Sequence, residues 1–69
     1  MQLTEAKVRE LREELDYLKR VKRPKLLADI AEAREAGDLT NSPGGQAVQE
    51  KWELVEARIQ EIEAALAKA

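Results

Sequence analysis

Gly37-Asp-Leu-Thr-Asn-Ser-Pro-Gly-Gly45 is the stretch of this chain that decides its fold. Its second half, Asn41 to Gly45, consists entirely of residues that end helices and form turns. The sequence on either side has the apolar spacing of helices. We therefore predict one loop, over about residues 37–45, between two helical segments.

The segment before the loop is predicted to be a helix over about residues 5–36. Thr4 is a suitable N-cap, because its hydroxyl can accept a hydrogen bond from a free amide of the first turn. Pro24 lacks an amide donor and its ring clashes with the carbonyl four residues earlier, so we expect a kink near Arg20 to Arg23, or a break into two helices. The apolar positions of this helix, in order, are Val8, Leu11, Leu15, Leu18, Val21, Leu27 and Ile30.

The segment after the loop is predicted to be a second helix, over about residues 46–68. Its apolar residues recur at alternating spacings of 4 and 3, which is a heptad repeat; they are Val48, Trp52, Val55, Ile59, Ile62 and Leu66. Two apolar-striped helices joined by a short loop bury their stripes by folding back on each other. We predict an all-α fold, a single domain over residues 1–69 that forms an antiparallel two-helix coiled-coil hairpin. Mirroring the chain about Asn41 places Leu27 near Val55.

The same mirroring leaves the start of the first helix without an obvious partner. The first helix outruns the second by roughly nine residues, or about 14 Å. Leu3, Val8 and Leu11 are the apolar residues concerned. Either this segment folds over the open end, or it self-associates with another chain through Val8 and Leu11, or the sequence is the front piece of a longer protein.

Composition excludes several functional classes. The 69 residues include no Cys and no His, which removes disulfides, thiolate and imidazole metal sites and a histidine base, so we expect no enzyme active site. A net charge of −2 and a lack of Phe argue against a general nucleic-acid surface. No long apolar run opens the chain, so we expect a cytoplasmic protein with no membrane partner.

One cluster of basic side chains nevertheless leaves nucleic-acid binding open as an alternative; it comprises Lys19, Arg20, Lys22, Arg23 and Lys25. The hairpin alignment places this cluster across from three acidic residues, namely Glu56, Glu61 and Glu63. We therefore favour a solvated band of ion pairs between the helices.

Several segments together resemble the amino-terminal coiled-coil domain of the GreA family of bacterial transcript cleavage factors. They are residues 11–19, Val21-Lys-Arg-Pro24, Ile30-Ala-Glu-Ala-Arg-Glu-Ala-Gly-Asp-Leu39 and Glu56-Ala-Arg-Ile-Gln-Glu-Ile-Glu63. The resemblance implies a transcription elongation factor whose hairpin enters the secondary channel of RNA polymerase. Acidic tip residues then help to hold the polymerase's catalytic Mg²⁺, and the polymerase cleaves its own backtracked RNA 3′ end. The factor itself is not an enzyme.

The resemblance also assigns roles to single residues around the tip, which comprises Asp38, Leu39, Thr40 and Asn41. Asp38 matches the first acidic residue and would be the Mg²⁺ ligand, and Arg34 matches a basic residue implicated in RNA contact. Asn41 stands where the family has a Glu, and Gln49 where a second Arg is usual. The family's carboxy-terminal domain is absent from this sequence. We therefore expect polymerase binding with weakened or absent stimulation of cleavage, the alternative being a structural or self-associating hairpin without polymerase activity.

Overall fold

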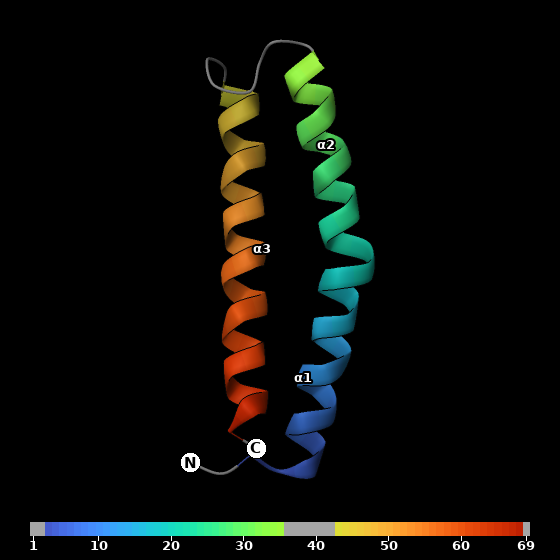
Figure 1. Ribbon diagram of the computed structural model, residues 1–69, viewed down its shortest axis with the longest axis vertical. Coiled ribbons are helices and arrows are strands. Elements are labelled where there is room, and N and C mark those ends of the chain that lie inside the picture. The colour runs from blue at the N-terminus through green and yellow to red at the C-terminus, as the bar shows by residue number, and fades with distance from the viewer. Residues whose placement is uncertain (1–2, 36–42, 69) are drawn as a thin grey trace.

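The structure is a long helical hairpin, seen in a computed structural model that describes residues 3–35 and 43–68. Four helical segments follow one another in the described residues: α1 (Glu5–Tyr17), the π-helical segment η1 (Leu18–Lys22), α2 (Arg23–Glu35) and α3 (Pro43–Ala67). The first three run on as one arm, and α3 returns antiparallel beside it (Figure 1). The Cα trace extends over 46 × 19 × 14 Å. The predicted all-α hairpin is confirmed.

The first arm begins at the predicted cap. Thr4 has an extended backbone, and its hydroxyl oxygen accepts a hydrogen bond of 3.0 Å from the amide of Lys7. The Thr4 carbonyl accepts the first intrahelical bond, from the amide of Val8, at 2.9 Å. The cap satisfies first-turn donors that would otherwise be left to water.

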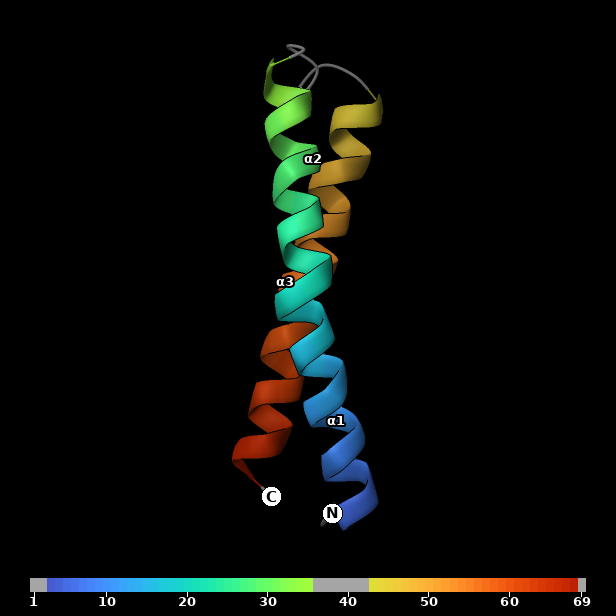
Figure 2. The same cartoon turned by 90° about the vertical axis from the view of Figure 1, so that its right-hand side faces the viewer.

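The expected kink takes the form of a π-helical turn just before Pro24. The amide of Arg23 donates to the carbonyl of Leu18, five residues earlier, instead of to the carbonyl four residues earlier. Pro24 has no amide with which to continue the α-helical pattern, and the wider turn accommodates its ring without breaking the arm. The arm therefore curves past α3 as one continuous rod (Figure 2).

The π turn also shifts the apolar stripe by one residue, and here the prediction from the sequence was wrong. Val21 and Leu27 were expected in the stripe, but each is 51% exposed. Leu26 is buried in their place at 4% exposure. A heptad step from Leu18 leads to residue 25, and the extra residue of the π turn moves the inward position to residue 26.

The core is one row of side chains between the two arms. Its buried members are Leu11, Leu18, Leu26, Val55, Ile59 and Ile62, and partly buried side chains packed against them are Leu3, Leu15, Trp52, Ala65 and Leu66. Ile59 and Ile62 are almost wholly enclosed. The heptad prediction for the second helix is confirmed at Trp52, Val55, Ile59, Ile62 and Leu66.

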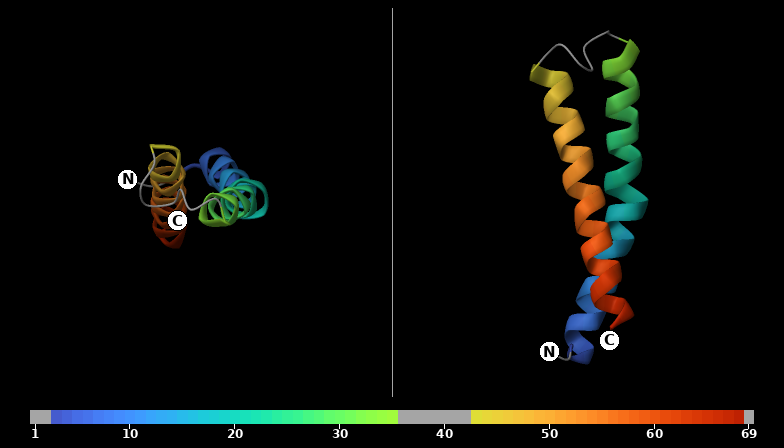
Figure 3. Two further views of the ribbon diagram at one scale, coloured as in Figure 1. Left: turned by 90° about the horizontal axis from the view of Figure 1, so that it is seen from above. Right: turned by 60° about the vertical axis from the view of Figure 1, so that its left-hand side comes forward.

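The start of the first arm has partners within the chain, which the alignment mirrored about Asn41 did not provide. Leu11 is 5% exposed, Leu3 packs against the core, and both line one hollow with Ile62. The second helix begins at Pro43, three residues before the predicted start, because proline suits a first helical turn whose amides have no partner. The carboxyl end of α3 lies beside the start of α1 (Figure 3). Ala65, near that end, also lines the hollow that contains Leu11.

Candidate functional site

The predicted tip lies outside the described residues. Asp38, Leu39, Thr40 and Asn41 all fall within the segment 36–42 that joins α2 to α3. Their assigned roles therefore stay predictions. The structure does fix what lies on either side of this segment, which is the last turn of α2 and the first turn of α3.

Arg34 is the predicted site residue that the structure describes. It lies in the last turn of α2 and is exposed. A cation is favourable there, because the carbonyls at a helix carboxyl end carry partial negative charge. Within residues 3–35 and 43–68, no carboxylate lies within 4.0 Å of Arg34. Arg34 thus lies exposed at the carboxyl end of α2, close in sequence to the segment 36–42.

Ion pairs between the arms follow part of the predicted pattern. Arg23 donates two hydrogen bonds to Glu56, at 2.8 and 3.1 Å, with about 30% of each side chain exposed. Lys19 donates to Glu63 at 2.8 Å. These two pairs confirm the expected cross-helix pairing for part of the basic cluster. Arg20 instead pairs with Asp16 in its own helix.

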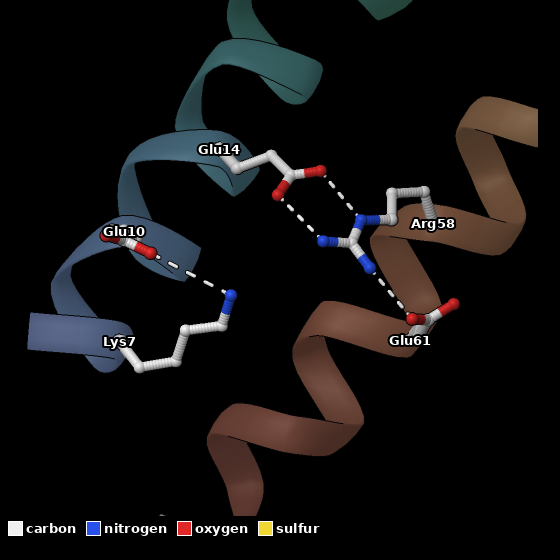
Figure 4. Close-up of polar contacts among 5 residues, drawn as sticks. All are labelled: Lys7, Glu10, Glu14, Arg58 and Glu61. Atoms are coloured by element: carbon white, nitrogen blue, oxygen red, sulfur yellow. Dashed lines mark hydrogen bonds and ion pairs between the residues drawn. The ribbon is translucent and has the colours of Figure 1, made fainter. Parts of the chain in front are cut away.

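Arg58 forms a second set of contacts that the sequence analysis missed (Figure 4). Its guanidinium holds Glu14 by two hydrogen bonds of 2.7 and 2.8 Å across the arms. A third bond, of 2.8 Å, goes to Glu61, which was expected to face the basic cluster. The hydrogen bonds from Arg58 hold the pKa of Glu14 below its usual range, and those same bonds raise the pKa of Arg58.

Lys22 and Lys25, the remaining members of the basic cluster, have no acidic partner in the part of the chain that the structure describes. They line an open groove of about 320 Å³ together with Lys51 and Leu54 of α3. Leu54 is 70% exposed. From the sequence, the charges of this lysine pair were expected to be compensated by acidic residues of α3, because helical spacing alone does not say which residues of the cluster face α3.

The described residues offer no metal site of their own. Among residues 3–35 and 43–68, no three acidic side chains come together in a group that could hold an ion. Nor does any helix in these ranges have the length and apolar content needed to cross a membrane. The predicted metal ligand, Asp38, lies outside these ranges, and its role stays a prediction.

The fold and the charge pairs define an antiparallel coiled-coil hairpin, held by one apolar row and by ion pairs along its edges. The family model described as "Transcription elongation factor, N-terminal", that of GreA and GreB, matches residues 1–69. The chain belongs to this family. The resemblance noted in the sequence is thereby confirmed.

Several similar proteins are named transcription elongation factor GreA. Transcription elongation factor GreA of Yersinia pestis is 58% identical over 59 residues, which cover 86% of this chain and 37% of that protein. GreA of Haemophilus influenzae is 52% identical over 60 residues, or 87% of this chain and 38% of the relative. GreA of Alkalilimnicola ehrlichii is 49% identical over 67 residues, or 97% and 42%. The chain thus spans about two fifths of the length of these relatives.

Membership in this family also bears on the expected class of activity. The family is described as one of transcription elongation factors, which are named as factors and not as enzymes. The sequence prediction that the chain is not an enzyme is therefore confirmed at the level of the family.

Proposed function

We propose that this chain binds bacterial RNA polymerase by inserting its hairpin into the secondary channel, and that it stimulates transcript cleavage weakly or not at all. The observation that carries the proposal is the family match over all 69 residues, together with the long, narrow shape of the hairpin. Such a rod could pass along a narrow channel with residues 36–42 leading. The chain would act in the cytoplasm, where the polymerase works.

The stiffness of the rod supports delivery of a tip over some distance. Two bidentate ion pairs join the arms beside the apolar row. They are Arg23 with Glu56, and Arg58 with Glu14. Bidentate pairs fix geometry more tightly than single contacts do. The π turn bends the first arm without interrupting it. The two arms can therefore move as one body.

The residues at the tip support weak cleavage at most. Asp38 would give one carboxylate to a magnesium ion held by the polymerase, and magnesium favours such oxygen ligands. Asn41 offers only a neutral amide oxygen where the family has a Glu. Arg34, exposed one turn before the tip, would attract the phosphates of the RNA 3′ end.

An assay on backtracked elongation complexes tests both parts of the proposal. We expect the chain to bind the polymerase and to compete with a full-length GreA for the channel, while RNA cleavage stays near the rate without factor. Cleavage as fast as that with full-length GreA would contradict our view of the tip. Failure to compete at any concentration would contradict channel binding.

A self-associating hairpin is the competing proposal, and the structure weakens its predicted contact. Leu11 is buried within the hairpin and cannot also face a second chain. Val8 is half-buried and lines a groove with charged neighbours, among them Arg9 and Arg12. Sedimentation at several concentrations separates the two proposals, since we expect a monomer throughout.

A further inference from the structure

Two successive repeats along one edge of the hairpin differ in their charges. Across the arms, one repeat carries opposite charges and the next carries like charges. Residues seven apart on α3 share a face, so Lys51 and Arg58 lie on the same edge. On the first arm, the π turn makes the equivalent step eight residues, as it does from Leu18 to Leu26 in the core. Lys22 therefore occupies the position of Glu14, one repeat closer to the tip.

The consequence is that Lys22 and Lys51 hold the positions that Glu14 and Arg58 hold in the neighbouring repeat, and both lysines line the groove. The first repeat is closed by two hydrogen bonds, but in the second the groove of about 320 Å³ lies open between the arms. Lys25 adds a third positive charge to this groove, and Asp29 is the one acidic residue that lines it. Asp29 makes no ion pair within 4.0 Å among the described residues. Like charges across a coiled coil oppose its folding.

The groove also exposes apolar surface. Its base is formed by Leu26 and Val55, two members of the core. Leu54 stands beside them at 70% exposure, the most exposed large apolar side chain among the described residues. Leu26, Val55 and Leu54 thus give the groove an apolar centre with lysines around it, and protein contacts likewise have an apolar core and a polar rim.

We propose that this groove, lined by Lys22, Lys25, Lys51 and Leu54, binds an acidic protein segment that places an apolar side chain against Leu54. The proposal rests on the function proposed above. The acidic segment then belongs to RNA polymerase, and the groove is the surface of the hairpin that binds it. Charge complementarity selects the occupant, because the lysines lack carboxylate partners in the described part of the hairpin. The exposed leucine favours a protein over RNA, which would gain little from an aliphatic side chain.

Charge reversal at Lys51 gives a test in which binding and stability move in opposite directions. Lys51→Glu places a carboxylate across from Lys22, as Glu14 lies across from Arg58, so we expect a higher melting temperature by circular dichroism. The same change sets the new carboxylate against an acidic partner, so we expect affinity for core RNA polymerase to fall by about tenfold or more. Lys68→Glu is the matched control, because it makes the same charge change just after the end of α3, far from the groove, and should leave affinity within about twofold.

Leu54→Ala completes the test. It removes exposed surface only, so we expect an unchanged melting temperature and affinity lower by about fivefold or more. If the unaltered chain does not bind the polymerase, the proposed function fails and the groove assignment with it. If it binds and Lys51→Glu weakens binding no more than Lys68→Glu does, the groove assignment alone is wrong. Two further outcomes would also overturn the groove assignment. One is that the chain binds a single-stranded RNA oligonucleotide, and that Lys51→Glu abolishes this binding while Leu54→Ala leaves it unchanged. The other is that the chain forms a dimer that Leu54→Ala dissociates.

Discussion

Leu26 and Leu27 are adjacent leucines that the structure places in opposite situations, and replacing each by alanine tests the π turn directly. Leu26 is 4% exposed and Leu27 is 51% exposed. Truncation removes three carbons, each worth about 0.8 kcal/mol when fully buried. We therefore expect Leu26→Ala to cost about 3 kcal/mol once the cavity is included, and Leu27→Ala about 1 kcal/mol. Alanine and leucine have similar helix propensities, so the difference reports packing.

Thermal unfolding followed by circular dichroism at 222 nm measures both variants. For a chain of this size, 1 kcal/mol shifts the melting temperature by about 4–8 °C, so Leu26→Ala should melt about 15 °C lower and Leu27→Ala about 5 °C lower. A larger loss for Leu27→Ala than for Leu26→Ala would show that the first arm keeps a regular α-helical register. That result would refute both the π turn and the alignment of Lys22 with Lys51 that depends on it.

Further predictions concern the ion pairs and the tip. Arg58 lowers the pKa of Glu14 in the folded chain, so the ionised Glu14 stabilises the fold above the ordinary carboxyl pKa. This stabilisation is lost as the pH falls through the lower pKa of the folded state. Glu14→Gln should therefore flatten the decline in melting temperature between about pH 5 and pH 3. Glu56→Gln should cost about 1 kcal/mol, whereas Glu10→Gln, at an exposed pair of 3.8 Å, should cost nearly nothing in the same melts. Asn41→Glu should raise RNA cleavage in backtracked complexes several-fold above the unaltered chain, because a second carboxylate can then reach the magnesium ion.

Each of these has its own contradicting outcome. An unchanged acid dependence in Glu14→Gln would mean that Arg58 does not hold this carboxylate in solution. Equal losses for Glu56→Gln and Glu10→Gln would mean that the bidentate geometry at Arg23 adds nothing. Cleavage that rises equally with Asn41→Gln, which adds length without charge, would remove the carboxylate from the explanation.

Much of the fold could be predicted because it depends on local signals. Turn formers between two apolar repeats, a threonine cap and a heptad from Trp52 to Leu66 each act over a few residues. The position of Pro24 was enough to place the irregularity in the first arm. A proline can cause a kink, a break or a wider turn in a helix. Which of these forms depends on how the neighbouring arm packs, so the position of Pro24 did not predict the form of the irregularity.

The candidate site was predictable to a smaller extent. The motif around Arg34 and Asp38 pointed to the family, and the family match confirmed it. The groove beside Leu54 gave no sequence signal, because it depends on which lysines of a basic run face the other arm. That choice follows from the shift at the π turn, which moves Lys22 onto the edge and leaves Lys19 and Arg23 to pair with Glu63 and Glu56.

By itself, the sequence determined that this chain is an antiparallel helical hairpin of the GreA family, since helix periodicity, capping and turn chemistry are local and the family motif is linear. Only the tertiary structure decided which leucine of the pair 26–27 is buried and which charges meet across the arms. The physical reason is that one extra residue in a helical turn rotates everything after it by about 100°. Such a rotation is settled by packing against the second arm.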